Sequence, residues 1–328
     1  MNNLKMRFLY TAVGSAMYAR FIVSHYHTFF RINGGDEHKV VLPDCDLDGE
    51  FVADPFLFVW DGRVWLFFEG MRKGRGNRGV SKGLIGCMCY SKGAWNYQGI
   101  AIEESFHLSY PQVFEDNGVV YMIPETAQTG EISLYEAIDF PKKWKKKAVI
   151  IKGKYVDSSL FRKNGMYYIV TTPDDRTSHA ELWCATSLTG MWERHPASNG
   201  VLSSLSFRRN GGMIYEDAGH IYRIAQDCDG GYGRRLYRVS VMELSTSSYS
   251  EGSPVLLQDA ISWVQPEMHH TYNRVRQGDM FFEVVDRHYN TFRKLMPFMI
   301  SAFWCFMDGI RYIMRMVVRQ FDKKQRSF

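Results

Sequence analysis

Long apolar runs, paired metal-binding cysteines and a strong charge imbalance are all missing from this 328-residue chain. No segment reaches the roughly 20 consecutive apolar residues that a transmembrane helix needs. None of the six cysteines belongs to a Cys-x-x-Cys pair of the kind that marks zinc or redox sites, and there is no Asn-x-Ser/Thr sequence. Scattered thiols without a glycosylation sequence favour a reducing, cytoplasmic compartment. We predict no metal site and no cofactor.

The basic residues exceed the acidic residues by only five, and they gather in three short clusters, at residues 72–82, 142–147 and 311–326. No nucleic-acid-binding motif accompanies them, and no basic stripe interleaved with aromatic residues runs through the body of the chain. We therefore expect no nucleic-acid partner. A membrane surface or a phosphorylated ligand would explain these clusters.

What the chain does contain is a pattern that occurs five times. Each copy has a short apolar run, a turn glycine eight residues after the first position of the copy, and a second apolar run. Asn-Gly and Asp-Gly pairs at several of these turns indicate β-hairpins. The copies start 47 to 59 residues apart, a period that fits a four-stranded propeller blade. Their first positions are Asp54, Tyr110, Asp157, Gly211 and His270.

The repeats predict an all-β fold, a five-bladed β-propeller over residues 40–290, with short helical extensions at residues 1–39 and 291–328. At the N-terminus, the run from Phe8 to Ala19 predicts a short amphipathic helix that continues toward Phe30. A signal peptide is the alternative interpretation, because Lys5 and Arg7 precede the run.

The C-terminal extension has the period of a basic amphipathic helix. Its apolar residues recur at steps of three and four, and arginines follow one another at steps of four. This pattern is typical of a helix that lies in the headgroup region of a membrane. We expect a cytoplasmic protein held peripherally on the inner face of the cell membrane, and packing of this helix on the propeller is the alternative. The apolar face comprises Leu295, Met299, Phe303, Phe306, Ile310, Ile313 and Val317.

In a propeller, the first strand of each blade lies beside the central channel, so the first positions of the repeats should line one funnel. The second strands should end near the same rim, at Glu69, Glu125, Thr172 and Gln226. An alternative is that the aspartates cap turns. That alternative explains one aspartate better than it explains a ring of acidic, histidine and amide side chains at equivalent places.

Several segments resemble a known family. They include Ala53-Asp54-Pro55-Phe56, His107-Leu108-Ser109-Tyr110-Pro111, Pro124-Glu125, Val156-Asp157-Ser158-Ser159, Arg223, Gln226-Asp227 and Tyr232-Gly233. Together they resemble the propeller domain at the N-terminus of plant glucosamine inositolphosphorylceramide transferases, over roughly residues 40 to 290. The resemblance implies a fold similar to that of the five-bladed glycoside hydrolases of family 43. In the plant enzymes the transferase chemistry belongs to a separate C-terminal domain.

The resemblance also implies roles for individual residues. Asp54 matches the general base of family 43, and Asp157 matches the aspartate that tunes the acid. The acid itself, a glutamate at the start of blade four, has no counterpart, because residues 208–212 contain no carboxylate. Glu125 or Asp227 would have to replace it as a catalytic acid. The predicted substrate-binding residues are Glu69, His107, Tyr110, Arg208, Arg223, Gln226, Tyr232 and His270.

Two functions remain open at this point. One is an enzyme that acts on a glycosidic or sugar-phosphate bond in the synthesis of a surface polysaccharide or glycolipid, with transfer favoured over hydrolysis. Its substrate would be a carbohydrate, a sugar nucleotide or a lipid-linked sugar. The other is a non-catalytic glycan-binding module that assists a partner glycosyltransferase. In structural terms, Glu69 and Glu125 could simply be strand-end acids paired with arginine, and Asp227 could belong to a plain turn.

Overall fold

The structure is a computed structural model that describes residues 22–73, 82–175, 177–200, 202–227, 229, 233–265 and 268–292. The chain divides into two units, Tyr26–His288 and a second unit made of Met1–His25 and Tyr289–Phe328. Of the second unit, the described residues are the outer ends of two strands, where the rings of His25 and Tyr289 stack 5.0 Å apart. The larger unit, Tyr26–His288, contains all five repeats.

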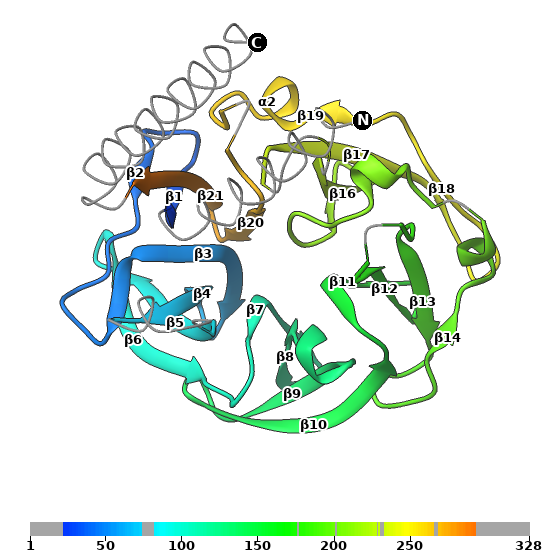
Figure 1. Cartoon of the computed structure of the whole chain (residues 1–328), viewed down its shortest axis with the longest axis horizontal. Coiled ribbons are helices and arrows are strands. Elements are labelled where there is room, and N and C mark those ends of the chain that lie inside the picture. The colour runs from blue at the N-terminus through cyan, green and yellow to red at the C-terminus, as the bar shows by residue number, and fades with distance from the viewer. Residues whose placement is uncertain are drawn as a thin grey trace, which may run out of the picture. The chain divides into compact units, whose positions relative to one another are not determined.

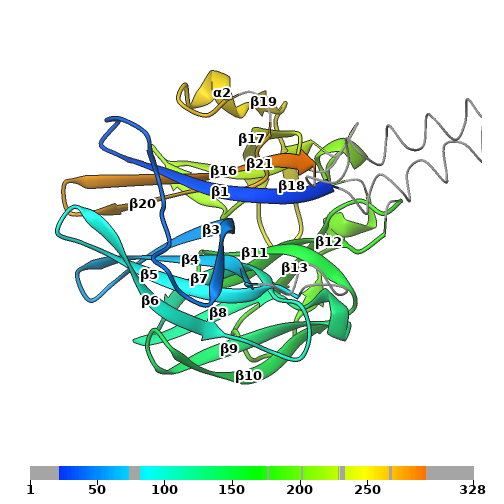
Figure 2. The same cartoon turned by 60° about the vertical axis from the view of Figure 1, so that its left-hand side comes forward.

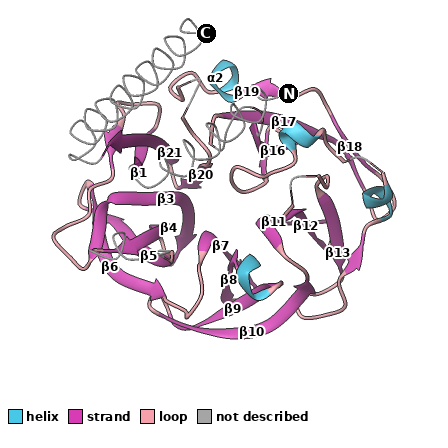
Figure 3. Ribbon diagram, in the orientation of Figure 1, coloured by secondary structure: helices cyan, strands magenta, loops and turns pink. Residues whose placement is uncertain are grey.

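Strands dominate this unit, and its helices are short (Figure 3). The strands of the first repeat are β3 (Leu47–Trp60), β4 (Arg63–Arg72), β5 (Leu84–Ser91) and β6 (Ala94–Ile102). Those of the second are β7 (Ser109–Asp116), β8 (Val119–Glu125), β9 (Glu131–Asp139) and β10 (Lys143–Lys152). Those of the third are β11 (Tyr155–Lys163), β12 (Met166–Pro173), β13 (Glu181–Ala185) and β14 (Glu193–Arg194).

The fourth repeat contains β15 (Tyr215–Asp217), β16 (His220–Asp227), β17 (Arg235–Leu244), β18 (Tyr249–Glu251), β19 (Val255–Leu256) and the one-turn helix α2 (Leu257–Ala260). The fifth contributes β20 (Tyr272–Gln277) and β21 (Met280–Phe292). Two further strands, β1 (Ile22–Ile32) and β2 (His38–Lys39), precede the first repeat. Among the described residues, short 3-10 helices lie at Ala127–Thr129, Pro196–Asn199 and Leu205–Phe207.

The sheets of Tyr26–His288 are arranged around a common centre, with β3, β7, β11, β16 and β20 on the inner side (Figure 1). Hydrophobic cores fill the spaces between neighbouring sheets. Between the first and second repeats, for example, Phe67 of β4 belongs to the same buried cluster as Met122 of β8 and Tyr135 of β9. Because each sheet buries both faces against its neighbours, strands such as β4 carry nearly unbroken apolar runs.

The described strands form four hydrogen-bonded sheets, because the fifth repeat shares a sheet with the first. In that sheet the order is β20-β21-β1-β3-β4-β5-β6. The link between β1 and β3 is parallel and has Tyr26 opposite Phe51, and the turned view in Figure 2 shows these strands as neighbours. The prediction of an all-β protein is confirmed, whereas five separate blades stay a prediction.

The N-terminal helix predicted to continue toward Phe30 is wrong where the structure describes it. Residues 22–32 form strand β1. Alternate side chains of this strand, at Tyr26, Thr28 and Phe30, are buried, while those between them are only half-buried. That period of two belongs to a strand with one face in a core, not to a helix. The described sheet therefore begins before residue 40.

The predicted helix over residues 291–328 lies outside the described residues, apart from the last two positions of β21. The first part of the N-terminal extension, residues 1–21, also lies outside them. Among the residues that are described, no helix has the length and apolarity required to cross a bilayer.

Candidate functional site

The inner strands of the first three repeats share an unusual backbone. Asp54, Tyr110 and Asp157, the first positions of these repeats, have φ angles of 46°, 48° and 50°. Each lies where the pairing with the second strand shifts register, so each is part of a β-bulge. A left-handed conformation costs a residue with a side chain on the order of 1–3 kcal/mol, and outside turns such strained residues cluster at functional sites.

These bulges turn three backbone N–H groups toward carboxylates of the preceding repeat. The amide of Asp54 donates to Oδ2 of Asp286 at 3.1 Å. The amide of Tyr110 donates to Oδ2 of Asp54 at 3.1 Å. The amide of Asp157 donates to Oε2 of Glu125 at 3.2 Å. The strained backbone therefore links the fifth, first, second and third repeats through their acidic side chains.

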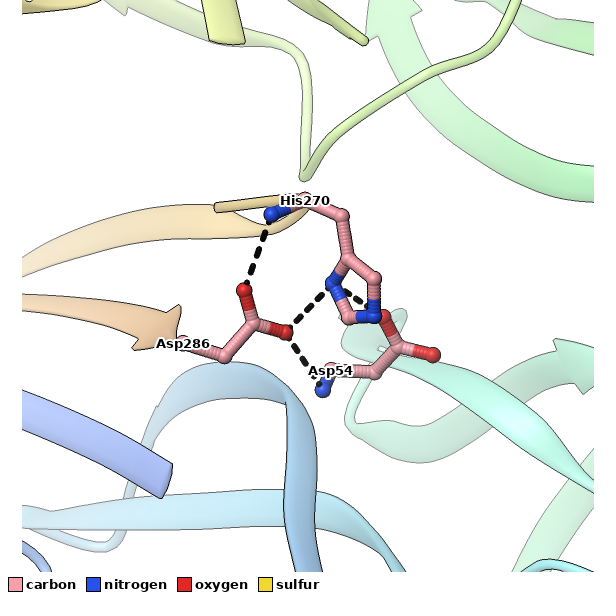
Figure 4. A group of neighbouring side chains, drawn as sticks. All are labelled: Asp54, His270 and Asp286. Atoms are coloured by element: carbon pink, nitrogen blue, oxygen red, sulfur yellow. Dashed lines mark hydrogen bonds and ion pairs between the residues drawn. The ribbon is translucent and has the colours of Figure 1, made fainter. Parts of the chain in front are cut away.

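Where the last repeat meets the first, four side chains form what we call the seam cluster: Asp54, His270, Thr271 and Asp286. Figure 4 shows three of them, Asp54, His270 and Asp286. Nδ1 of His270 lies 2.5 Å from Oδ2 of Asp286 and 3.6 Å from Oδ1 of Asp54. The hydroxyl of Thr271 donates to Oδ1 of Asp54 at 2.6 Å. Oδ1 of Asp286 accepts from the backbone amides of His270 and Thr271. All four side chains are buried.

The charges of the seam cluster support one another. Burial alone would lower the pKa of His270, but the charges of Asp286 and Asp54 raise it to about 9. Burial raises the pKa of Asp54 to about 6, although His270 opposes that shift. The pKa of Asp286 is lowered, because the charge and hydrogen bonds of His270 outweigh the effect of burial. At neutral pH the cluster therefore holds an imidazolium between two carboxylates.

The same three side chains, Asp54, His270 and Asp286, are close enough together to ligate a metal ion, which the sequence did not lead us to expect. Their donor set does not fit one as it stands. A metal bound through Nδ1 of His270 would need the lone pair of that nitrogen, which makes a 2.5 Å ion pair with Asp286. The imidazolium therefore already supplies the positive charge that a metal would bring.

A second group, the rim cluster, consists of Glu125, Asp157 and Arg209. Nε of Arg209 donates to Oδ2 of Asp157 at 2.6 Å, and Gln226 donates to the same oxygen at 3.1 Å. Burial, and then the charge of Asp157, raise the pKa of Glu125 to about 8, while Arg209 opposes the shift. Glu125 therefore carries a proton at neutral pH. Unlike the seam cluster, this group reaches solvent, because the Arg209 side chain is 21% exposed.

Glu69 and His107 extend the acidic region. Burial, and then the charge of Asp54, hold the pKa of Glu69 well above its usual range. Nδ1 of His107 accepts from the backbone amide of Gly83 at 2.8 Å, so a neutral ring carries its proton on Nε2, 3.5 Å from Glu69. Burial lowers the pKa of His107, which favours that neutral form.

Comparison with known proteins gives the family. Residues 40–286 match the model described as "Glucosamine inositolphosphorylceramide transferase 1, N-terminal". The chain belongs to this family. The Arabidopsis thaliana protein named glucosamine inositolphosphorylceramide transferase 1 is 34% identical over 271 residues, which are 73% of this chain and 34% of that protein. The chain thus spans about a third of the length of the curated relatives it matches.

Solved structures confirm the kind of fold. The chain resembles a β-xylosidase, RS223, with a TM-score of 0.51, 11% identity and coverage of 72% of this chain and 91% of the enzyme. It also resembles a family 43 β-xylosidase/α-arabinofuranosidase from a compost metagenome, with a TM-score of 0.51, 11% identity and coverage of 73% and 90%. At this identity the likeness concerns the fold alone.

Tyr110 begins the second repeat on the inner strand β7, and its hydroxyl makes hydrogen bonds within the protein. The hydroxyl donates to the carbonyl of Gly212 at 2.8 Å, accepts from the amide of the same residue at 2.7 Å, and lies 2.9 Å from the Ser159 hydroxyl. The ring thus spans from the second repeat to the third and fourth. Its side chain is fully buried, which gives it a structural role in the described site.

Three other predicted residues lie away from the two clusters. Arg223 is buried in a bidentate pair with Glu251, at 2.6 and 2.9 Å, and donates further to the carbonyl of Phe207. Arg208 donates to the carbonyl of Ser178. Asp227 accepts from the amide of Asp229 in the turn after β16, on the face of the strand opposite Gln226. Tyr232 lies outside the described residues.

Two central residues were missed in the sequence. Asp286 lies within β21, one residue beyond Val285, which pairs with Tyr272, so following the second strand of repeat five three residues past Glu283 would have found it. Arg209 lies in the segment that lacks the expected carboxylate and from which Arg208 was chosen instead as a substrate-binding residue. No sequence signal distinguishes Arg209 from Arg208. The direction of each side chain is decided by the backbone between β14 and β16.

Proposed function

We propose that this chain is a carbohydrate-active propeller that acts on a glycosidic or sugar-phosphate bond during the synthesis of a surface polysaccharide or glycolipid. The observation that carries the proposal is the difference between two central carboxyl groups. Burial keeps Glu125 protonated, with a pKa of about 8, while Asp54 has a pKa of about 6 and is mostly ionised at neutral pH. Pairs of carboxyl groups with separated pKa values are typical of sites that use one as acid and the other as base.

In this proposal Glu125 donates its proton to the leaving oxygen, and Asp54 accepts a proton from the attacking hydroxyl. Asp157 sets the pKa of Glu125, as its charge already does. Arg209 would bind an anionic leaving group, since a guanidinium pairs strongly with phosphate. Arg209 would pair with a phosphate leaving group but not with a neutral one, so transfer from a sugar phosphate or nucleotide sugar is favoured over hydrolysis of a neutral glycoside.

A second candidate is a glycan-binding module that assists a partner glycosyltransferase. The hydrogen bonding at Asp54 favours it, because one carboxylate oxygen accepts from Thr271 and the other from the amide of Tyr110. A base engaged in this way is a weaker proton acceptor. The relatives are also about three times as long as the part of them that this chain matches, so a catalytic domain elsewhere in those proteins is compatible with either role.

Two further parts of the proposal rest on the sequence. We propose that the five repeats make five blades, with β1, β20 and β21 forming the last of them. We also propose a cytoplasmic protein that is held on the inner face of the cell membrane by residues 291–328. Co-sedimentation with vesicles, with and without anionic lipid, of the full chain and of a version that ends at Asn290 tests the second point. Equal partitioning of both versions would contradict it.

The test of function combines binding and turnover on the full chain. Nucleotide sugars, neutral oligosaccharides and 4-nitrophenyl glycosides are each titrated by calorimetry and then assayed for nucleotide or nitrophenol release. We expect nucleotide release from at least one nucleotide sugar, little nitrophenol release, and a loss of about 10²–10⁴-fold in turnover in Glu125→Gln. A matched control is Glu131→Gln, an acid that pairs with Lys146 outside both clusters.

The outcomes separate the candidates. Binding that Asp157→Asn abolishes, with no turnover of any probe, supports the glycan-binding module. Strong nitrophenol release that Glu125→Gln removes would make the protein a hydrolase. Absence of both binding and turnover for all three classes of probe would overturn the carbohydrate proposal.

A further inference from the structure

Away from the centre, a groove lies where the first sheet faces the second. Its volume is about 530 Å³, within the usual range for small-ligand sites. A second hollow of about 340 Å³ shares Arg63, Trp65 and Gln98 with it. We call the larger hollow the Trp65 groove. Its lining residues are Trp60, Asp61, Arg63, Trp65, Gln98, Asp139, Phe140, Pro141 and Lys142.

The Trp65 groove is separate from the seam and rim clusters. Trp60 and Arg63 flank the turn between β3 and β4, whereas Asp54 and Glu69 lie toward the other end of these two strands. Six residues of extended chain separate Asp54 from Trp60, which corresponds to roughly 20 Å. A ligand in the groove would therefore not touch the central carboxylates.

The indole N–H of Trp65, a residue that lines the groove, is buried and has an unmet hydrogen-bonding need. The Trp65 residue is 7% exposed, and among the described residues its Nε1–H finds no hydrogen-bond partner. Nε1 of Trp95 is likewise without a partner among the described residues, whereas Nε1 of Trp144 donates to the carbonyl of Pro141 and that of Trp192 to the carbonyl of Leu188. A buried donor without an acceptor costs on the order of 1–3 kcal/mol, so an acceptor supplied by a ligand would be favoured.

The rest of the lining narrows the chemistry of that ligand. The ring of Trp60 stacks on Phe58 at 6.1 Å and lines the groove, as do the rings of Trp65 and Phe140. The charged lining residues balance, with Asp61 and Asp139 against Arg63 and Lys142. Neither an anion nor a cation is favoured by such a set. A purely apolar ligand would leave the Trp65 indole N–H unpaired.

We infer that the Trp65 groove binds a neutral oligosaccharide. A sugar ring has an apolar face that packs on an aromatic ring, and it carries hydroxyl groups around its edge. One hydroxyl accepts from the Trp65 indole, and others pair with the carboxamide of Gln98 and the exposed guanidinium of Arg63. This second site goes beyond the proposed function at the centre and does not depend on it.

Nuclear magnetic resonance of the full chain tests the inference. The eight tryptophans give eight indole ¹H–¹⁵N signals, and Trp65→Phe identifies that of Trp65. The probes are cellotriose, xylotriose, mannotriose and galactotriose. We expect at least one of them to shift the Trp65 signal saturably, with a Kd on the order of 1 mM or lower. The signal of Trp183, whose Nε1 donates to Glu181, should not move.

Variants decide where binding occurs. Trp60→Ala, at a half-buried position on the rim of the groove, should weaken the interaction at least about tenfold, while Trp183→Phe and Glu125→Gln should leave it unchanged. Gln98→Ala provides a second test, should Trp60→Ala fold poorly. A Trp65 signal that moves with none of the four probes at about 20 mM, a concentration well above that Kd, would overturn the inference. So would a shift that disappears in Glu125→Gln, because the centre would then be the binding site.

Discussion

The seam cluster and the rim cluster each combine two carboxyl groups with one positively charged side chain, but they differ in how far the protein itself satisfies those groups. In the seam cluster, both carboxylates have donors from the protein itself, and His270 provides a positive charge at the middle. In the rim cluster, Arg209 provides the positive charge from a partly exposed position, and Glu125 keeps a proton. The first arrangement satisfies its own charges and the second leaves capacity for a ligand.

The difference follows from where the two clusters lie in the chain. The seam cluster joins residues more than 200 positions apart, since the amide of Asp54 donates to Asp286. It therefore stabilises the closure between the first and last repeats. The rim cluster joins the second, third and fourth repeats, which are already connected in order along the chain. We expect mutations in the seam cluster to affect stability first, and mutations in the rim cluster to affect binding first.

The largest effect is expected from Asp286→Asn. The carboxylate accepts from three backbone amides and pairs with His270, and the substitution leaves a buried imidazolium without its main counter-charge. Breaking one partner of a buried pair typically costs about 3–5 kcal/mol. Urea unfolding at pH 7 measures the loss. A cost below that of Asp157→Asn would show that the seam does not close the ring.

Arg209→Gln should weaken binding of an anionic sugar ligand by about 10- to 100-fold, since a hydrogen bond to a charged group contributes on the order of 1.5–3 kcal/mol. Binding of a neutral oligosaccharide at the Trp65 groove should stay the same. Calorimetry with a nucleotide sugar and with a neutral trisaccharide measures the two effects. Equal weakening of both would mean that the variant disturbs the fold instead of the site.

A smaller change in stability, about 1–2 kcal/mol, is expected from Asp157→Asn. The amide that replaces the carboxylate keeps its size, and Arg209 reaches solvent after losing its partner. Ligand binding at the centre should nevertheless be lost, because Asp157 orients Arg209 and sets the pKa of Glu125. Parallel unfolding and binding measurements check this. Intact binding together with a large loss of stability would make Asp157 structural.

The smallest expected difference between the two clusters is in how the free energy of unfolding depends on pH. Folding raises the pKa of His270 from 6.5 to about 9, so its contribution is complete below pH 6.5 and is lost as the pH rises through 9. Folding raises the pKa of Glu125 from 4.5 to about 8. Its contribution to the free energy of unfolding is therefore complete below pH 4.5 and is lost as the pH rises through 8.

Urea unfolding from pH 4 to pH 10 measures both contributions. His270→Gln should flatten the decline between about pH 6.5 and 9, and Glu125→Gln should flatten it between about pH 4.5 and 8. Identical profiles for the two variants would contradict this assignment of the two groups.

Much of the architecture follows from local sequence. Asp-Gly and Asn-Gly turns and apolar runs of strand length predicted the hairpins β3–β4, β7–β8 and β11–β12, and the structure has them in place. Equivalent positions within each copy, counted from the turn glycine, also predicted that Asp54, Asp157, Glu69 and Glu125 would lie near one centre. These features depend on period and on turn chemistry, which adjacent residues encode.

Tertiary structure alone decided the rest. Residues 22–32 form a strand because they pair with β21 on one side and β3 on the other. The sequence around these residues contains no signal for a partner as far away in the chain as β21. Asp286 joined Asp54, Tyr110 was drawn into hydrogen bonds with Gly212, and Arg209 turned toward Asp157 while Arg208 turned away. The sequence determined which chemical groups each repeat carries. The packing of the repeats against one another determined which of them became one another's partners, because burial leaves a charge stable only where an opposite charge or a donor reaches it.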